Sequence, residues 1–364
     1  MTSPQTTLIT GDELVGRLDE GDLFLLDVRE PDEVADWSIP GVTNIPIDSL
    51  AARLDEVPAN RDVVVICARG ARAERGRAVL EENGRFSRVL DGGMAGWAST
   101  YDSVAQDFSG ARVIQVRRRG KGCLSYVVGA GERCAVIDPS LEIERYEKIA
   151  SAHGWRISYI VDTHLHADHV SGARALAGAT GATLLLNPGD PFGFDYEPLV
   201  DGREMELAAG VNLAVSSVSV PGHTEGSTMY RLGDAAVFTG DTLFLDSVGR
   251  PDLAEQAEPF AHHLYASLHE RVLPLPDSVT VFPAHYGPGI DVAEGVFVAK
   301  PLGELRGELA ALTLSEDDFV SWALANVKDR PPNYQSIVLV NMGREAVTPE
   351  TIELEVGPNR CAIG

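Results

Sequence analysis

The sequence predicts a two-domain α/β protein, with a small α/β domain at the N-terminus and a larger, strand-rich domain after it. Over residues 1–105, short apolar segments alternate with helical patterns, which is typical of a mainly parallel sheet. A polar stretch without clear periodicity, residues 99–110, follows and places the domain boundary near Gln106. From Ala111 onward, short β-type segments dominate. We therefore expect domains at residues 1–105 and 106–364, the second ending in a helical extension and tail.

Composition excludes several classes of function. The formal net charge is −24, so nucleic acids and anionic membrane surfaces are not expected as partners. No apolar segment approaches the roughly 18 to 20 residues that span a bilayer, and the N-terminus lacks the pattern of a secretory signal. The four cysteines are widely and irregularly spaced, which fits neither a zinc knuckle nor a disulfide framework. We expect a cytoplasmic protein. The sequence is also compatible with a homo-oligomer.

Residues 163–169, Thr-His-Leu-His-Ala-Asp-His, are the most informative segment of the chain. They lie between an apolar strand pattern and a helical pattern over 170–181, which places several metal-ligating groups in one loop. Three later β-type segments each end in another His or Asp. The candidate ligands are His164, His166, Asp168, His169, His223, Asp241 and His285. Strand ends that meet at one edge of a sheet can build a metal pocket from these distant segments.

This pattern resembles the metallo-β-lactamase superfamily over about residues 111–300. The resemblance implies an αββα sandwich with the metal at one edge of the packed sheets. The superfamily includes zinc hydrolases, glyoxalase II, flavodiiron proteins and iron persulfide dioxygenases. Its fold therefore does not specify the reaction, which must be argued from other residues.

In the N-terminal domain, Cys67 directly follows an apolar strand pattern and precedes a helical pattern over residues 73–84. The loop between them contains Gly70 and two arginines, Arg69 and Arg72. Inward-turned N–H groups, a helix N-terminus and two guanidinium groups would favour the thiolate and bind an anionic sulfur donor. We therefore expect a reactive cysteine in an anion-binding loop.

This domain resembles a rhodanese sulfurtransferase over about residues 5–105. The resemblance rests on residues 26–30, 39–41, 67–72 and 90–97, and Ser38 replaces the His that usually precedes Ile-Pro-Gly. It implies transfer of a sulfane sulfur through a Cys67 persulfide, between thiosulfate or sulfite and a thiol. Arg69, Arg72 and the loop amides would hold the thiosulfate or persulfide anion.

Within the superfamily, the larger domain is most similar to the persulfide dioxygenase (sulfur dioxygenase) branch, on residues 163–169, 238–244 and 249–252, although glyoxalase II shares much of them. The similarity implies one non-heme Fe(II) per chain, held by His164, His223 and Asp241, with positions open for a persulfide sulfur and O₂. The remaining motif residues, His166, Asp168, His169 and His285, would then orient the ligands or, as in glyoxalase-type enzymes, complete a second metal site.

Two further residues are candidates for holding the thiol carrier of the persulfide. Arg250 and Tyr286 both follow predicted metal ligands closely, but an ion pair of Arg250 with Asp252 and an ordinary packed tyrosine are equally good interpretations. Residues 299–303, Ala-Lys-Pro-Leu-Gly, lack the Asn-Pro-Arg pattern common in enzymes that use glutathione persulfide. The carrier could therefore be glutathione or another small thiol, such as mycothiol or coenzyme A.

The fusion itself favours persulfide chemistry, because a sulfurtransferase and a persulfide oxidase would share persulfide and sulfite as intermediates. We expect oxidation of a low-molecular-weight persulfide by O₂ and water to sulfite and thiol, as in sulfide detoxification, with sulfur exchange at Cys67. Two alternatives stay open. One is a two-zinc, glyoxalase II-like thioester hydrolase with an accessory rhodanese domain, and the other is a non-enzymatic sulfur carrier or redox sensor.

Overall fold

The computed structural model describes residues 7–18, 20–217, 219–252, 256–287, 289–290, 292, 295–327, 330, 333–357 and 361–363. The chain divides into two compact units. The first comprises residues 1–102, 117–121 and 356–358, and the second comprises residues 103–116, 122–355 and 359–364. Across the described ranges, no helix combines the length and the apolar character needed to cross a membrane.

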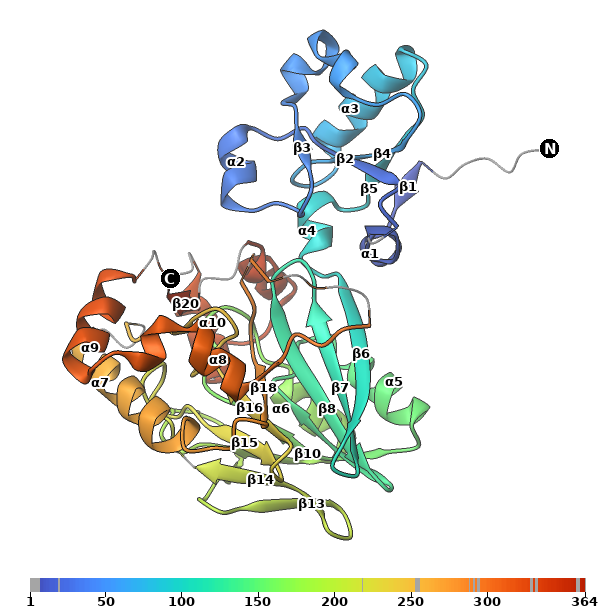
Figure 1. Ribbon diagram of the computed structural model, residues 1–364. Helices are drawn as coiled ribbons and strands as arrows, with labels where there is room; N and C mark the ends of the chain where they lie inside the picture. Colours follow the sequence, from blue (N-terminus) through green and yellow to red (C-terminus); the bar gives the residue numbers. More distant parts are fainter. Residues whose placement is uncertain are drawn as a thin grey trace. The chain divides into compact units, whose positions relative to one another are not determined.

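The first unit is built on a five-stranded parallel sheet in the order β1-β5-β4-β2-β3 (Figure 1). Its strands are β1 (Leu8–Ile9), β2 (Leu23–Asp27), β3 (Thr43–Asn44), β4 (Asp62–Ile66) and β5 (Ser87–Leu90). Its α-helices are α1 (Gly11–Leu18), α2 (Pro31–Asp36), α3 (Ala71–Glu82) and α4 (Gly93–Trp97), and two 3₁₀ helices span Ile47–Ala52 and Leu54–Glu56.

Both faces of this sheet are covered. Val63 and Val65 of β4 join one apolar cluster, which includes residues of α3. Their neighbours Val64 and Ile66 join a second cluster on the opposite face with residues of α1 and α4. Because side chains alternate between the two faces of a strand, a strand buried on both sides is apolar throughout. The prediction of a mainly parallel α/β domain is confirmed.

The second unit contains two large sheets. The seven-stranded sheet has the order β12-β11-β10-β9-β8-β7-β6 and the six-stranded sheet has the order β13-β14-β15-β16-β18-β19. The first consists of β6 (Tyr101–Phe108), β7 (Ala111–Arg118), β8 (Cys123–Ala130), β9 (Arg133–Ile137), β10 (Arg156–Val161), β11 (Thr183–Leu186) and β12 (Glu197–Pro198). The second consists of β13 (Glu204–Ala208), β14 (Val211–Ser217), β15 (Met229–Leu232), β16 (Ala236–Gly240), β18 (Thr280–Pro283) and β19 (Lys300–Pro301).

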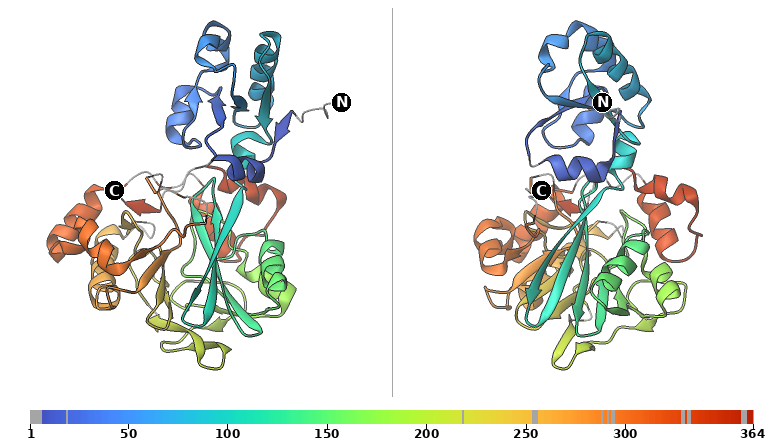
Figure 2. Two further views of the ribbon diagram at one scale, coloured as in Figure 1. Left: turned by 45° about the vertical axis from the view of Figure 1, so that its right-hand side comes forward. Right: turned by 90° about the vertical axis from the view of Figure 1, so that its right-hand side faces the viewer.

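The two sheets pack face to face around one apolar core. Tyr126 of β8 lies edge-on to Phe238 of β16 and Phe282 of β18, with ring centroids 4.9 and 5.5 Å apart. The helices are α5 (Glu144–Ala152), α6 (Ala173–Thr180), α7 (Ala257–Ser267), α8 (Leu302–Glu308), α9 (Glu316–Ala325) and α10 (Tyr334–Asn341), with shorter helical turns at Leu268–Val272, Ala310–Thr313 and Pro349–Glu355. The right-hand view of Figure 2 shows α5 and α6 outside one sheet and the orange helices outside the other. The predicted αββα sandwich is confirmed.

Two local expectations need correction. Residues 99–110 are not an irregular linker, because β6 spans Tyr101–Phe108 and lies beside β7 in the sheet. Only Tyr101 and Val104 of this strand are buried, so its mostly polar side chains concealed a strand held by backbone pairing. The helix after the histidine motif begins at Ala173 instead of Val170. At the C-terminal end, β20 (Ala362–Ile363) pairs with β17 (Val248–Gly249) and so belongs to the second unit.

Candidate metal centre

The topology brings the ends of four strands to one edge of the sandwich. His164 and its neighbours follow β10, His223 lies between β14 and β15, Asp241 follows β16 and His285 follows β18. Strands β16 and β18 are parallel, and β14 runs in the same direction as β16 because each is antiparallel to β15. The carboxyl ends of these strands therefore meet, as the sequence predicted for the motif residues.

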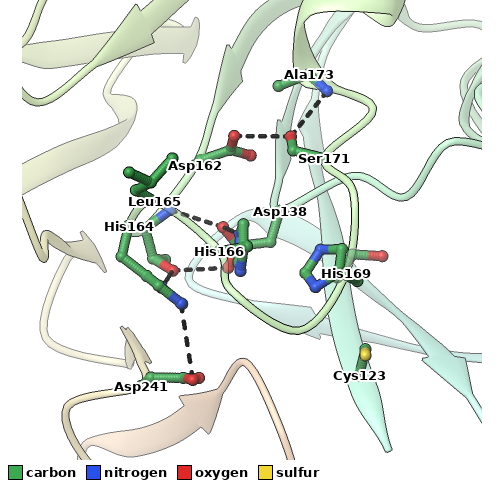
Figure 3. Close-up of polar contacts among 12 residues, drawn as sticks. Cys123, Asp138, Asp162, His164, Leu165, His166, His169, Ser171, Ala173 and Asp241 are labelled. Carbon is green, nitrogen blue, oxygen red and sulfur yellow. Dashed lines mark hydrogen bonds and ion pairs between the residues drawn. The ribbon is translucent and has the colours of Figure 1, made fainter. Parts of the chain in front are cut away.

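Three of these side chains converge on one point. His164 Nε2 lies 3.7 Å and His223 Nε2 lies 3.4 Å from Asp241 Oδ2, and the three atoms lie within 4.8 Å of one another. Each residue is at most 3% exposed. Figure 3 shows His164 turned toward Asp241. One ion with bonds of roughly 2.0 to 2.2 Å, typical of nitrogen and carboxylate ligands, can contact all three atoms.

The hydrogen bonds of the two histidines leave the converging nitrogens without protons. His223 Nδ1 donates to the carbonyl oxygen of Arg250 at 3.0 Å, so its Nε2 carries the lone pair in the neutral ring. His164 Nδ1 lies 2.9 Å from Thr163 Oγ1, which itself donates to Asp138 Oδ2. Among the described residues, His164 Nε2, His223 Nε2 and Asp241 Oδ2 are buried and have no hydrogen-bond partner. Buried polar atoms are rarely left so, and a bound metal would satisfy all three.

The protonation states of the three residues also favour metal binding. Burial lowers the pKa of His164 well below its usual value, helped by the nearby His166, and burial also lowers the pKa of His223. Burial alone would raise the pKa of Asp241, but His285 and His164 outweigh this and hold it below its usual value. Two neutral imidazoles and one carboxylate are the protonation states that a metal site requires.

A second group lies beside the first and consists of Cys123, Asp168, His169 and His285, all buried. Asp168 pairs with His169 at 3.2 Å and with His285 at 2.9 Å. Burial lowers the pKa of both histidines, but attraction to Asp168 outweighs it and leaves both well above the usual value. His285 Nδ1 also lies 2.6 Å from Asp241 Oδ1, so this residue joins the two groups.

Cys123 was not identified as a site residue from the sequence. It is the first residue of β8, which is antiparallel to β9, so it lies at the edge where β9 ends. It also forms an isolated antiparallel bridge with His285. Burial and Asp168 raise the pKa of its thiol, but His285 and a hydrogen bond from His169 outweigh them, giving about 7. The start of an antiparallel strand after a turn is the signal that could have indicated it.

His166 lies between the two groups, with its ring centroid 4.1 Å from those of His164 and His169. Its Nε2 lies 3.1 Å from Asp138 Oδ1, while its buried Nδ1 has no partner among the described residues. Asp138 also accepts the backbone N–H of Thr163 at 2.6 Å. Burial raises the pKa of neighbouring Asp162 to about 6. Asp138 thus holds the histidine loop through Thr163 and His166, and Asp162 directly precedes that loop. Neither aspartate was predicted.

Two more unpredicted residues hold the ligand loops. Buried Asp190 accepts the N–H groups of Leu165 and Gly226 at 2.9 and 3.0 Å, and the hydroxyl of Thr224 at 3.2 Å. It thereby ties the His164 loop to the His223 loop. Asn341, at the end of α10, donates to the carbonyl oxygens of His166 and His169 at 2.9 and 2.8 Å. Neither residue belongs to a motif, so only the fold reveals its role.

The two candidates for holding a thiol carrier have other contacts. Arg250 is fully buried and forms a two-point ion pair with Asp252, at 2.7 and 2.9 Å, so the structure shows the ion-pair alternative for this residue. Tyr286 is partly buried against the core, and its backbone N–H donates to Gly122 at 3.0 Å. A direct role for either in carrier binding stays a prediction.

In the first unit, Cys67 lies at the carboxyl end of β4 with 1% of its surface exposed. Its Sγ accepts the backbone N–H of Gly70 at 3.1 Å, and Gly70 adopts a φ of 101°, which favours glycine. Arg69 is exposed. Arg72 pairs with Glu33 through two contacts of 2.6 and 2.8 Å, so part of its charge is already matched. Glu33 was not predicted from the sequence.

Comparisons with known proteins agree with this architecture. The model of the metallo-beta-lactamase superfamily matches residues 118–285, and the rhodanese-like domain model matches residues 10–100. The chain is 31% identical over 208 residues to "Persulfide dioxygenase ETHE1, mitochondrial" of Bos taurus, covering 55% of this chain and 76% of that protein. It is 41% identical over 150 residues to a hydroxyacylglutathione hydrolase of Anaeromyxobacter dehalogenans, covering 40% and 56%. The crystal structure of ETHE1 from Myxococcus xanthus superposes with a TM-score of 0.55 at 25% identity, covering 67% and 99%.

The fold, the His/Asp pocket and the family models together define a metallo-β-lactamase-superfamily protein with an N-terminal rhodanese-like domain. Within that superfamily, the chain belongs to the family of the ETHE1 persulfide dioxygenases.

Proposed function

We propose that the protein is an Fe(II)-dependent persulfide dioxygenase joined to a sulfurtransferase. In the proposed reaction, a thiol persulfide, O₂ and water give the free thiol, sulfite and two protons. The observation that carries this proposal is the convergence of His164, His223 and Asp241 through three buried atoms that have no hydrogen-bond partner in the part of the chain that the structure describes. The similarity to ETHE1 proteins supports it.

The donor set fits this metal. Two imidazoles and one carboxylate would hold the iron and, as in non-heme iron oxygenases, would leave room for a sulfur anion and O₂ to bind it. Bound Fe(II) would supply the electron transfer that allows O₂ to react with the persulfide sulfur. The protein holds Asp241 in place through His285 Nδ1, which donates to its other oxygen at 2.6 Å. Because the three ligand side chains are buried, bulk water would be kept away from the reacting sulfur.

Asp168, His169 and His285 hold protons beside the site in this proposal. Attraction to Asp168 raises the pKa of both histidines, against the effect of burial. They are therefore charged when no cation competes and can hydrogen-bond to a thiol leaving the site.

For the first unit, we propose sulfur transfer through Cys67. The thiolate would take the outer sulfur of thiosulfate, forming a Cys67 persulfide and releasing sulfite. In the reverse direction, sulfite attacks the outer sulfur, forms the S–S bond of thiosulfate and leaves the thiolate. The N–H of Gly70, which already donates to Sγ, would stabilise that anion. The thiol that receives or delivers the sulfur is glutathione or another small thiol.

The direct test supplies purified protein with glutathione persulfide and measures O₂ uptake and sulfite formation. We expect both to occur in equal amounts and to require iron. The same preparation is offered a glutathione thioester as a control, and we expect no hydrolysis. Thioester hydrolysis without persulfide-dependent O₂ uptake would instead support a two-zinc hydrolase. That second candidate is favoured by His166 Nδ1, which has no hydrogen-bond partner within the described ranges, and by the similarity to hydroxyacylglutathione hydrolases.

A further inference from the structure

Helix α10 holds the histidine loop through its last residue. Asn341 is 8% exposed and uses both of its amide N–H groups, which donate to the carbonyl oxygens of His166 and His169 at 2.9 and 2.8 Å. Its Oδ1 accepts the backbone N–H of Ser171 at 2.9 Å. An amide whose donors and acceptor are all engaged is fixed in orientation. One side chain therefore holds three backbone groups of this loop.

Apolar packing and a carboxylate hold the same loop. Ile337 and Val340 of α10 form a buried cluster with Val170, which directly follows the histidine motif. Buried Glu355 accepts the backbone N–H of Val170 at 2.6 Å. Leu354, the residue before it, packs against the same cluster. The helix and the turn that ends at Glu355 therefore fix the end of the histidine loop together.

At the other end of α10, Arg330 reaches the segment that supports His223. Arg330 Nε lies 3.2 Å from Asp252 Oδ2, and its Nη2 donates to the carbonyl oxygen of Asp252 at 2.5 Å. Its Nη1 donates to the hydroxyl of Tyr334, the first residue of α10, at 2.9 Å. The guanidinium also lies over the Tyr334 ring, 5.4 Å from the centroid. Arg330 thus joins Asp252 to the beginning of α10.

Asp252 in turn fixes the group that orients His223. Its carboxylate holds the guanidinium of Arg250 at 2.7 and 2.9 Å, and Arg250 is fully buried. A buried guanidinium needs this partner, because an unmatched charge in the interior is strongly destabilising. The carbonyl oxygen of Arg250 accepts Nδ1 of His223 at 3.0 Å. The direction of His223 Nε2 therefore depends on the pair of Arg250 and Asp252.

We propose that α10, with Arg330 before it and Glu355 after it, is a brace that positions both metal-ligand loops together. One end holds the loop that carries His164, and the other end holds the support of His223. The helix has eight residues, and a length of roughly 12 Å lets it act as one rigid element. The brace deepens the proposed function and rests on its ligand set, because it keeps two of the three ligands in their relative positions.

Releasing either end of the brace in the full-length protein tests it. Asn341→Leu removes three hydrogen bonds at similar volume and should weaken Fe(II) binding roughly tenfold or more. Arg330→Met keeps the apolar stem but removes the guanidinium, and should weaken Fe(II) binding about two- to fivefold, as for other ion pairs that water reaches. The matched controls are Asn326→Leu at the end of α9 and Arg344→Met after α10, which should bind Fe(II) like the wild type. Affinities are measured anaerobically, with thermal unfolding to confirm that each variant folds.

The double variant distinguishes one brace from two independent supports. Changes more than roughly 7 to 10 Å apart with no shared partner usually have additive effects on free energy. In a single brace, release of one end already frees the other, so the double variant should bind Fe(II) more tightly than the product of the two single effects predicts. A loss equal to that product, or unchanged affinity in Arg330→Met, would overturn the proposal, and Arg330→Met decides alone if Asn341→Leu does not fold. Titration with Zn²⁺ should rank the variants in the same order, so the brace can hold or fail whether or not the protein oxidises persulfide.

Discussion

The Cys67 loop and the metal pocket both lie where strands end, yet they are built in different ways. The Cys67 site is local: a thiol, the amide of Gly70 and Arg72 come from six consecutive residues. The metal pocket is assembled from four strand ends, and its side chains fix one another through Asp138, Asp190 and His285. A substitution in the loop should therefore affect one step, whereas a substitution in the pocket should affect several residues at once.

The largest expected effects test whether the two sites act independently. Cys67→Ser should abolish sulfur transfer from thiosulfate and leave persulfide-dependent O₂ uptake intact, because the proposed oxidation uses no group of the Cys67 loop. Asp241→Ala should abolish O₂ uptake, since it removes one of three ligands, and should spare sulfur transfer. Both activities are assayed on each variant, with Cys134→Ser as a control for loss of a buried thiol. Loss of both activities in Cys67→Ser would show that the sites are not independent.

Histidines of the two groups should differ in their effect on iron. His223→Ala removes a proposed ligand and should leave almost no iron in the purified protein. His285→Ala removes a residue that orients Asp241 through one hydrogen bond, so most iron should stay while turnover falls. Metal analysis of both variants, with thermal unfolding to confirm folding, makes this comparison. Equal iron loss in the two would indicate a two-metal site in place of a mononuclear one.

Asp190 tests whether a residue that is not a proposed metal ligand positions the two histidine loops. Its carboxylate receives two backbone N–H groups and one hydroxyl from the two histidine loops. Asp190→Asn keeps the size but replaces one acceptor by a donor, so iron affinity should fall roughly tenfold or more. Asp195→Asn, an exposed position in the same connecting segment, is the matched control. Iron dissociation constants are measured for both variants and for the wild type. An Asp190→Asn value equal to that of the wild type would disprove the positioning role.

At the Cys67 site the smallest effect is expected at Glu33, a residue of α2 that pairs with Arg72. Hydrogen bonding to Arg72 lowers the pKa of Glu33 to about 2, so the ion pair is intact at neutral pH and would be lost only on strong acidification. Glu33→Gln removes the charge but keeps an acceptor for the N–H of Glu30. The freed Arg72 should lower the KM for thiosulfate about two- to fivefold at low salt, the range of an exposed ion pair. Steady-state kinetics with Glu30→Gln as control test this, and a raised KM would contradict it.

The contrast between the regions also explains what the sequence could predict. The Cys67 loop is contiguous, so its thiol, glycine and arginines are visible together. His164 to His169 are equally visible, and His223, Asp241 and His285 each end an apolar strand. Asp190 and Asn341 are different, because loop hydrogen bonds and helix packing bring them to the pocket and no local pattern records either. Cys123 begins a strand after a turn, but only the pairing of the strands shows that it lies opposite His285. The strand at 101–108 was missed for a related reason, since its exposed side chains carry no apolar period.

The central claim is that the pocket of His164, His223 and Asp241 holds one iron that oxidises persulfide. The most direct measurement is metal analysis and O₂ uptake on the same protein sample, purified without added metal. We expect about one iron per chain, and persulfide-dependent O₂ uptake that scales with iron content across preparations. About two zinc ions per chain, with no O₂ uptake on addition of persulfide, would contradict it.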